Sequence, residues 1–276
     1  MNLATALRDA AAKLACVSET ARLDAELLMA HALGLSRSDM LFRQSELAAP
    51  KGFDAMIERR LAHEPVAYIT GEQDFWDLTL RVTPAVLIPR SDSETLIEAA
   101  LEGPAPAQIL DLGTGSGALL LAALSAFPDA EGTAIDASAT ALDVARANAE
   151  ALGFAHRAQF HHLSWLEPLW AEKLGQQYDL ILCNPPYVES DADLAPMVAG
   201  HEPHSALFAG PDGLDDYRVL MPAIPALLTN GGRAILEIGY EQADAVGHLA
   251  EMSGLNATVR HDLSGKARAL VLQTDG

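Results

Sequence analysis

From residue 108 onward, short apolar segments alternate with segments of helical periodicity. The apolar segments have the length and composition of buried strands, and they lie at residues 108–112, 132–136, 158–162, 178–183 and 233–238. Helical patterns separate them, at residues 118–127, 138–152, 215–228 and 241–252. This alternation predicts an α/β fold in which a parallel sheet is covered by helices on both faces. Two last segments, 257–261 and 267–273, are predicted to close the sheet as an antiparallel pair.

The first part of the chain has a helical pattern instead. Apolar residues recur at helical spacing, which predicts helices at residues 3–14, 20–34 and 53–63. In the second of these helices the apolar positions are Leu23, Leu27, Leu28 and His31, and Gly34 is expected to end it.

Residues 61–82 differ from both patterns because side chains that favour strands are concentrated there. They are Val66, Tyr68, Ile69, Phe75, Trp76, Leu78, Leu80 and Val82, with Gly71 as a turn residue. We therefore predict a hairpin-like linker. The chain then divides into a small helical domain at residues 1–71, a β-hairpin linker at 72–90 and a larger domain at 91–276.

An excess of acidic residues limits the classes of function. The chain has 276 residues, with 38 Asp and Glu against 18 Lys and Arg, and a formal charge of −20. Residues 91–276 hold 26 acids and 8 bases, whereas residues 1–90 hold 12 acids and 10 bases. A broad basic face that grips nucleic-acid phosphates is therefore not expected.

The sequence also predicts the cellular compartment. Two cysteines, Cys16 and Cys183, give neither a disulfide framework nor a metal-type spacing. Arg8, Asp9 and Lys13 lie where a signal peptide would need an apolar stretch. The longest apolar runs are well short of the roughly 20 residues of a membrane span. We expect a cytoplasmic protein that does not bind membranes.

The first predicted strand of the larger domain runs into a glycine-rich loop and then a helix. The loop consists of Gly113, Thr114, Gly115, Ser116 and Gly117. Glycines let the backbone turn sharply and let a ligand approach main-chain N–H groups. Asp136 ends the next strand, where an acid can hold ribose hydroxyls. Loop, helix and acid together predict a nucleotide-like ligand at the carboxyl ends of the strands.

Asp111 helps to choose between two nucleotide-like cofactors. Read as Gly113-x-Gly115-x-x-Ala118, the loop also fits a dinucleotide fingerprint, which leaves NAD as an alternative. However, the negative charge of Asp111 beside the loop would repel a pyrophosphate, whereas it would suit a cationic sulfonium and an amine. The pattern Asp-x-Gly-x-Gly-x-Gly resembles the first motif of class I S-adenosylmethionine-dependent methyltransferases, which have a Rossmann-like fold.

A second motif, Asn184-Pro185-Pro186-Tyr187, directly follows the strand predicted at 178–183. The prolines fix the backbone and remove two N–H donors, so that neighbouring carbonyls can point at a ligand. Asn184 adds an oxygen acceptor and Tyr187 a flat face. Acceptors of this kind can orient a planar nitrogen, whose lone pair is delocalised, toward an incoming methyl group. The motif resembles the catalytic motif of amino-methyltransferases that act on glutamine amides or on adenine.

The rest of the chain separates these two substrates. Further motifs occur in order along the sequence: Gly71-Glu72-Gln73-Asp74-Phe75-Trp76, Val86-Leu87-Ile88-Pro89-Arg90, Glu202-Pro203, Ala206-Leu207-Phe208-Ala209-Gly210 and Asp212-Gly213-Leu214. With Asn184-Pro185-Pro186-Tyr187, this ordered set resembles the peptide chain release factor N5-glutamine methyltransferases over nearly the whole chain. The resemblance implies a mostly parallel sheet with a closing antiparallel strand, a small N-terminal helical domain and a hairpin linker.

The resemblance also implies roles for individual residues. S-adenosylmethionine, which leaves as S-adenosylhomocysteine, would be bound by Gly113, Thr114, Gly115, Ser116, Gly117, Asp111, Asp136, Asn184 and Trp165, the last packing near the adenine. The glutamine would be held by Asn184, Pro185, Pro186 and Tyr187, with Phe75 on the wall and Arg90 at the edge. Asn184, Pro185 and Tyr187 would be catalytic. The N-terminal helices would dock the release factor, and the enzyme would act as a monomer without a metal.

The sequence departs from the family pattern at two places. The stretch after Arg90 usually reads Pro-Glu-Thr-Glu, and here it is Ser91-Asp92-Ser93-Glu94. An aspartate often precedes the tryptophan, whereas Ser164 precedes Trp165 here, which leaves Trp165 to act by stacking alone.

Two other functions remain as alternatives. One is an adenine N6-methyltransferase that acts on DNA or RNA. Such an enzyme would need a basic groove for the nucleic acid, which the acidic composition of residues 91–276 does not favour. The other is a non-catalytic S-adenosylmethionine-binding adaptor, which would have no need of the amide-orienting acceptors. His161, His162, His201 and His204 are interpreted as surface or loop residues rather than metal ligands.

Overall fold

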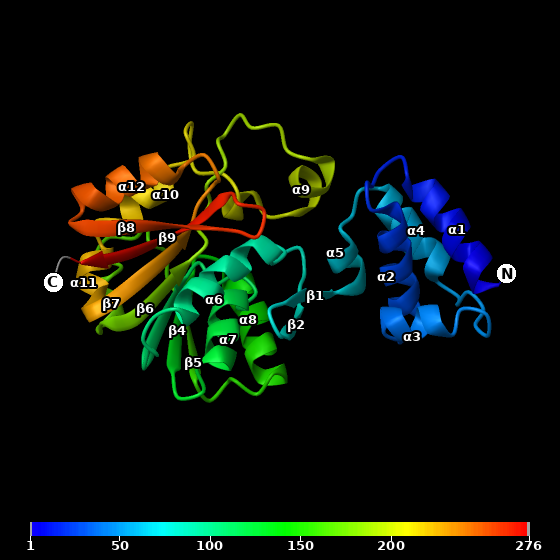
Figure 1. The fold of residues 1–276 in the computed structure, drawn as a ribbon, viewed down its shortest axis with the longest axis horizontal. Coiled ribbons are helices and arrows are strands. Elements are labelled where there is room, and N and C mark those ends of the chain that lie inside the picture. Colours follow the sequence, from blue (N-terminus) through cyan, green and yellow to red (C-terminus); the bar gives the residue numbers. More distant parts are fainter. Residues whose placement is uncertain (1, 275–276) are drawn as a thin grey trace. The chain divides into compact units, whose positions relative to one another are not determined.

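The computed structural model describes residues 2–274 and contains two compact units (Figure 1). One unit comprises the residues up to Glu72 together with Leu194–Glu202, and the other comprises Gln73–Asp193 and the residues from Pro203 onward. Among the described residues, no helix is both long enough and apolar enough to cross a membrane.

The first unit is helical. Its elements are α1 (Leu3–Leu14), α2 (Ala21–Leu33), α3 (Arg37–Phe42), α4 (Phe53–Leu61), α5 (Val66–Thr70) and α9 (Pro196–His201). Asn2 caps α1 by accepting a 2.8 Å hydrogen bond from the Thr5 amide, and Gly34 ends α2 in the left-handed conformation. The helices predicted at 3–14, 20–34 and 53–63 are confirmed.

The apolar face predicted for α2 is only partly correct. Leu28 is fully buried, but Leu23 and Leu27 are 39% and 37% exposed. The buried face of α2 instead carries Asp24 and Glu26. Asp24 accepts a 2.7 Å hydrogen bond from Nε of Arg60 on α4, and both side chains are buried. The other buried positions of α2 are Ala25, Leu28, Met29 and Ala30, so the side of the helix that faces the core differs from the one that Leu23 and Leu27 predict.

Residues 66–70, whose side chains favour strands, are helical instead, whereas the hairpin lies within the predicted linker at 72–90. Helix α5 begins after Pro65 and ends at Gly71, which is left-handed with φ 79° and therefore caps a helix rather than turning a hairpin. The hairpin is β1 (Glu72–Phe75) with β2 (Leu78–Arg81). It turns at Trp76, whose unusual φ of 58° is held by a 2.9 Å hydrogen bond from its amide to Glu94.

A seven-stranded sheet dominates the second unit. Its strands are β3 (Gln108–Leu112), β4 (Glu131–Asp136), β5 (Ala158–His162), β6 (Tyr178–Cys183), β7 (Leu228–Glu237), β8 (Leu255–His261) and β9 (Ala267–Thr274). The spatial order is β5-β4-β3-β6-β7-β9-β8, parallel as far as β7 and antiparallel for the last two strands. The α/β fold class, including the closing antiparallel pair, is confirmed.

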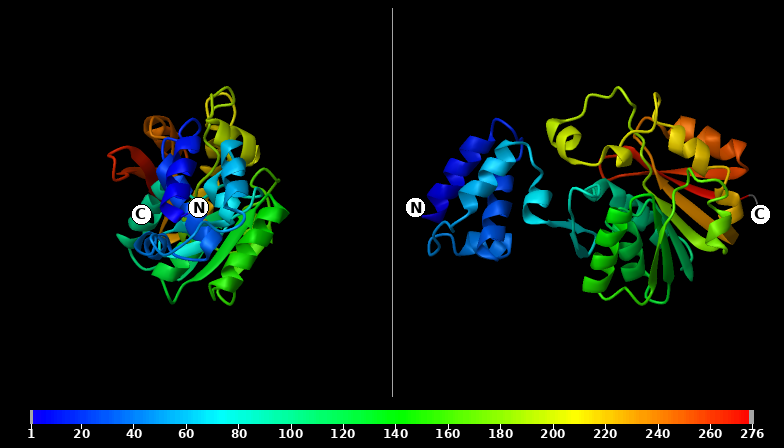
Figure 2. Two further views of the ribbon diagram at one scale, coloured as in Figure 1. Left: turned by 90° about the vertical axis from the view of Figure 1, so that its right-hand side faces the viewer. Right: turned by 180° about the vertical axis from the view of Figure 1, so that it is seen from behind.

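Helices cover both faces of this sheet (Figures 1 and 2). One face packs against α6 (Glu94–Leu101), α7 (Ala118–Ala126) and α8 (Ala139–Ala151), and the other against α10 (Asp215–Leu220), α11 (Ile224–Leu227) and α12 (Ala243–Met252). The single helix predicted at 215–228 is divided into α10 and α11 because Pro222 and Pro225 lack the N–H donors of a continuous helix. Helix α6 was not predicted.

Candidate active site

The glycine-rich loop and the Asn184 motif start side by side. Leu112, the last residue of β3, pairs with Cys183, the last residue of β6, and Gly113 and Asn184 follow them. These two strands are also where the strand order reverses, since β4 and β5 lie on one side of β3 and β7 lies beyond β6. Ligands of open α/β sheets bind outside the carboxyl ends of the strands at such a reversal.

The backbone of the loop depends on glycine. Gly113, Gly115 and Gly117 all have positive φ, between 55° and 87°. The amides of Gly113 and Thr114 donate to the Ile135 carbonyl at 2.9 and 3.0 Å, which fixes the loop to the end of β4. A Cβ atom on Gly113 would come within 2.9 Å of the Trp165 ring. Glycine here therefore serves both the turn and the close approach of the tryptophan.

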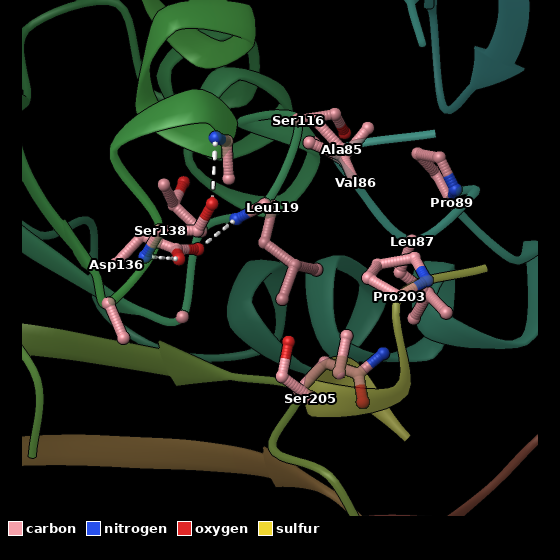
Figure 3. A pocket seen from close by; sticks show the side chains of 18 of the residues that line it. Ala85, Val86, Leu87, Pro89, Ser116, Leu119, Asp136, Ser138, Pro203 and Ser205 are labelled. Atoms are coloured by element: carbon pink, nitrogen blue, oxygen red, sulfur yellow. Dashed lines mark hydrogen bonds between the residues drawn. The ribbon is translucent and has the colours of Figure 1, made fainter. Parts of the chain in front are cut away.

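Asp136 joins the end of β4 to the loop (Figure 3). One carboxylate oxygen accepts a 2.9 Å hydrogen bond from the Gly115 amide, and the other accepts a 2.8 Å hydrogen bond from the Ser138 amide. Burial raises the pKa of Asp136 above its ordinary value, although these two amide donors act in the opposite direction. Because each oxygen uses one lone pair in this way, the other lone pairs remain for a ligand's hydroxyls.

A pocket of about 460 Å³ opens beside Asp136. Figure 3 shows Asp136 and Ser138 on one side of it, Ala85, Val86, Leu87, Pro89 and Pro203 on the opposite side, and Ser205 along the lower edge. Nine of the residues singled out from the sequence line it: Phe75, Gly113, Thr114, Gly115, Ser116, Asp136, Trp165, Asn184 and Pro186. Gly117, Asp111, Pro185, Tyr187 and Arg90 do not form part of this lining.

Asp111 lies beneath the loop instead of facing the pocket. Its side chain is fully buried, and one oxygen accepts a 2.6 Å hydrogen bond from the Thr114 hydroxyl. The other oxygen has no hydrogen-bond partner among the described residues. Burial raises the pKa of Asp111 to about 7. Its direct effect is therefore on the conformation of Thr114, which does line the pocket.

Asn184 and Tyr187 are connected by two further residues, Ser93, which lines the pocket, and Glu237, which does not. The Asn184 side-chain nitrogen donates to the Ser93 hydroxyl at 3.3 Å, and Ser93 in turn donates to the Glu237 carboxylate. The Tyr187 hydroxyl donates to the other oxygen of Glu237 at 3.2 Å. Glu237 is the last residue of β7 and is buried. One carboxylate thus connects both polar side chains of the motif.

Comparison with known proteins identifies the family. Residues 5–71 match the PrmC N-terminal domain, and residues 91–200 match the methyltransferase small domain. The chain is 43% identical to the release factor glutamine methyltransferase of Cereibacter sphaeroides, with 97% of each chain covered. It is 42% identical to the enzyme of the same name from Moorella thermoacetica, with 98% of each covered. The chain belongs to the release factor glutamine methyltransferase family.

The comparison with solved structures supports the fold class. A methyltransferase from Pyrococcus furiosus superposes with a TM-score of 0.53 at 16% identity, covering 78% of this chain and 95% of that one. The family resemblance stated from the motifs, and the prediction of a methyltransferase, are confirmed.

The two residues that connect Asn184 with Tyr187, Ser93 and Glu237, were not predicted as site residues from the sequence. Ser93 lies in the segment where the family pattern is broken, and it lines the pocket. Glu237 carries a signal that could have been used, because a lone carboxylate follows the apolar run Ala234-Ile235-Leu236. Such a residue is costly to bury without partners, so it implies a polar network.

The cysteine and the histidines considered from the sequence have contacts that are typical of structural residues. Burial raises the pKa of Cys183 well above its ordinary value, which disfavours a reactive thiolate. His162 contacts the Ala137 carbonyl at 2.9 Å, and His204 packs edge-on against Phe208. Over residues 2–274, no three His, Cys, Asp or Glu side chains are gathered as a metal site would require.

Proposed function

We propose that this methyltransferase transfers the methyl group of S-adenosylmethionine to the side-chain amide nitrogen (N5) of the glutamine in the Gly-Gly-Gln motif of class I peptide chain release factors. One observation carries the proposal: Asn184 and Pro186 line the same pocket as Asp136 and the glycine-rich loop. A cofactor held by the loop would therefore meet an amide held by Asn184. The names of the relatives support the choice of substrate.

The pocket has the features that the cofactor needs. Its volume of about 460 Å³ lies within the usual range of small-molecule sites. Asp136 has free lone pairs for the ribose hydroxyls, and Trp165 presents a ring beside Gly113 for the adenine. When bound, S-adenosylmethionine supplies an electrophilic methyl group on a sulfonium and leaves as S-adenosylhomocysteine.

The Asn184 motif supplies what an amide nucleophile lacks. An amide nitrogen is a poor nucleophile because its lone pair is delocalised into the carbonyl. The Asn184 side-chain oxygen, accepting one N–H of the glutamine, would orient the nitrogen toward the methyl group. It would also stabilise the positive charge that develops on that nitrogen during transfer. Pro185 and Pro186 are buried, and their rings restrict the backbone next to Asn184, which limits the movement of this acceptor.

The helical unit would provide the contacts that select a whole protein. A single glutamine side chain buries too little surface for the enzyme to recognise the protein that carries it. A specific protein–protein interface buries about 1,200–2,000 Å² in total. We assign the docking of the release factor to the N-terminal helices. The enzyme would act as a monomer in the cytoplasm, without a metal and without contacting nucleic acid.

Methyl transfer to defined substrates tests the proposal. Radiolabelled S-adenosylmethionine is incubated with purified release factor, with the same factor carrying alanine in place of the Gly-Gly-Gln glutamine, and with duplex DNA and RNA. Label is expected only in the unmodified factor. Label in nucleic acid would favour an adenine methyltransferase, and label in the alanine form would disprove the site of transfer. Cofactor binding without any transfer would mean a non-catalytic adaptor.

A further inference from the structure

Glu237 connects the two polar side chains of the Asn184 motif: it contacts Tyr187 directly and reaches Asn184 through Ser93. Its two oxygens accept from Ser93 and from Tyr187, and Ser93 accepts from Asn184. The Tyr217 hydroxyl adds a 2.7 Å hydrogen bond to the main-chain oxygen of residue 237. The carboxylate is therefore held on several sides.

The direction of these hydrogen bonds follows from the number of protons. An ionised carboxylate can only accept, and a serine hydroxyl has a single proton to donate. Ser93 must therefore give its proton to Glu237 and use its oxygen lone pair to accept from Asn184. Only the nitrogen of the Asn184 amide can donate to that lone pair. The Asn184 oxygen is then left for the pocket, as the acceptor that an incoming amide N–H needs.

We propose that Glu237 is a positioning residue for methyl transfer: through Ser93 it keeps the Asn184 amide turned with its oxygen toward the substrate, and it holds Tyr187 in place by accepting the phenol proton. This inference rests on the proposed function, since it assigns the Asn184 oxygen to the substrate amide. It also gives a role to Ser93, in the segment where the family pattern is broken. A threonine, usual at this place, keeps the same hydroxyl.

The same network makes activity depend on pH. Burial raises the pKa of Glu237 to about 7, while the Ser93 and Tyr187 hydrogen bonds and the charge of Arg268 act against the rise. Asp92 raises this pKa further, and Glu237 in turn raises the pKa of Tyr187, Cys183 and Tyr217. A protonated Glu237 can itself donate to Ser93. The hydrogen bonds from Glu237 through Ser93 to Asn184 can then reverse direction. The Asn184 amide would turn its nitrogen toward the substrate, and its N–H groups would repel the N–H of the substrate amide.

Steady-state kinetics on the full-length enzyme with release factor test this role. For the wild type we expect kcat, at saturating cofactor, to be roughly tenfold lower at pH 6 than at pH 8 because Glu237 titrates near 7. Glu237→Gln offers both a donor and an acceptor, so it no longer fixes the direction. Its kcat should fall on the order of 10–100-fold at pH 8, and the step near pH 7 should become smaller, with Asp111, whose pKa burial also raises to about 7, accounting for the remainder. KM for the release factor should change much less.

Two variants of Ser93 test the link between Glu237 and Asn184 without altering the buried charge of Glu237. Ser93→Ala should lower kcat by a factor comparable to Glu237→Gln, whereas Ser93→Thr should keep kcat near the wild-type value. Calorimetric affinity for S-adenosylmethionine should change by less than about threefold in all these variants, which shows that the fold is intact. Glu102→Gln serves as a matched control, because Glu102 is exposed and paired with Arg260.

The outcomes separate this inference from the proposed function. If the wild type does not methylate the glutamine, both are wrong. If the wild type is active but Ser93→Ala keeps wild-type kcat, the positioning role is wrong and the proposed function stands. A pH step of undiminished, wild-type size in Glu237→Gln would also overturn the role. If Glu237→Gln does not fold, equal kcat for Ser93→Ala and Ser93→Thr overturns it, and loss in the alanine variant alone supports it.

Discussion

The indole N–H of Trp165 donates a 2.6 Å hydrogen bond to Asp216. Trp165 lines the pocket, whereas Asp216, on α10, does not. The ring is thus held from behind while one face stays close to Gly113. The acid that binds this indole lies 51 positions further along the chain.

This hydrogen bond should influence cofactor affinity through the ring. Asp216→Ala is expected to weaken S-adenosylmethionine binding about 2–10-fold, because one hydrogen bond that orients the indole is lost. Asp216→Asn keeps an acceptor oxygen and should bind nearly as the wild type does. Calorimetry measures both, with the neighbouring Asp215→Asn as control. Equal losses in Asp216→Ala and Asp216→Asn would mean that charge, and not the orientation of the ring, is what matters.

Asp136 is expected to have a larger effect on the same affinity. Asp136→Ala removes the acceptor proposed for the ribose hydroxyls and also releases the Gly115 and Ser138 amides. Affinity for S-adenosylmethionine should fall by about 1–3 kcal/mol, or roughly 5–150-fold. The exposed Asp129→Ala, in the turn before β4, is the matched control. Unchanged affinity in Asp136→Ala would refute its placement at the cofactor.

Asn184→Ala should separate binding from turnover. Without the side-chain oxygen the glutamine amide is not oriented, so kcat should fall on the order of 10²–10³-fold. Cofactor affinity should remain largely intact, because Asp136 and the loop are untouched. Single-turnover methyl transfer with calorimetry in parallel measures both quantities. Turnover at the wild-type rate by the folded variant would exclude the role given to Asn184.

The sequence predicted those parts of the molecule in which a local pattern determines the structure. Strand β3, the glycine-rich loop and Asp136 were predicted because each has a signal within a few neighbouring residues. These signals are a short apolar run, glycines that allow positive φ, and an acid at the end of a strand. Residues 66–70 favour strands by propensity, yet Pro65 and Gly71 bound them as a helix. Propensity is a weak signal over five residues, and tertiary packing overrides it.

The parts that escaped prediction depend on contacts between distant residues. Ser93 and Glu237 are 144 positions apart, and Trp165 and Asp216 are 51 apart. Neither pair has a spacing that a local pattern could reveal. The same reason applies to the buried pair of Asp24 and Arg60, which are 36 positions apart. The motifs located the pocket, whereas the residues that hold those motifs in place required the structure.

The buried pair of Asp24 and Arg60 should be a main determinant of the stability of the helical unit. Asp24→Ala leaves Arg60 buried without its partner, and the free energy of unfolding should fall by about 3–5 kcal/mol. Replacing both, as Asp24→Leu with Arg60→Met, should recover most of the loss. Asp9→Ala, in an exposed pair with Arg8, should cost less than about 1 kcal/mol.

Two optical signals can localise this effect. Trp76, Trp165 and Trp170 all lie in the second unit, so tryptophan fluorescence reports on that unit, whereas far-ultraviolet circular dichroism reports on both. In urea, Asp24→Ala should shift the dichroism transition more than the fluorescence transition. A cost no greater than that of Asp9→Ala would show that the buried pair contributes little.

The last prediction concerns the docking role proposed for the helical unit. Leu23 and Leu27 lie one turn apart on α2 and are more than a third exposed. Removing residues 1–71 would be a poor test, because Leu194–Glu202 belongs to the same compact unit and would lose its partners. Replacing both leucines with serine alters the surface and leaves the core of the unit in place.

If this surface contacts the release factor, the double variant should lose about tenfold or more in kcat/KM on the intact factor. A short Gly-Gly-Gln peptide cannot use remote contacts, so kcat/KM on the peptide should change less than about twofold. Met252→Ser, at an exposed position on α12, is the control and should alter neither value. Equal losses on factor and peptide would mean that the leucines affect the enzyme's own structure, and this face of α2 would not be a docking surface.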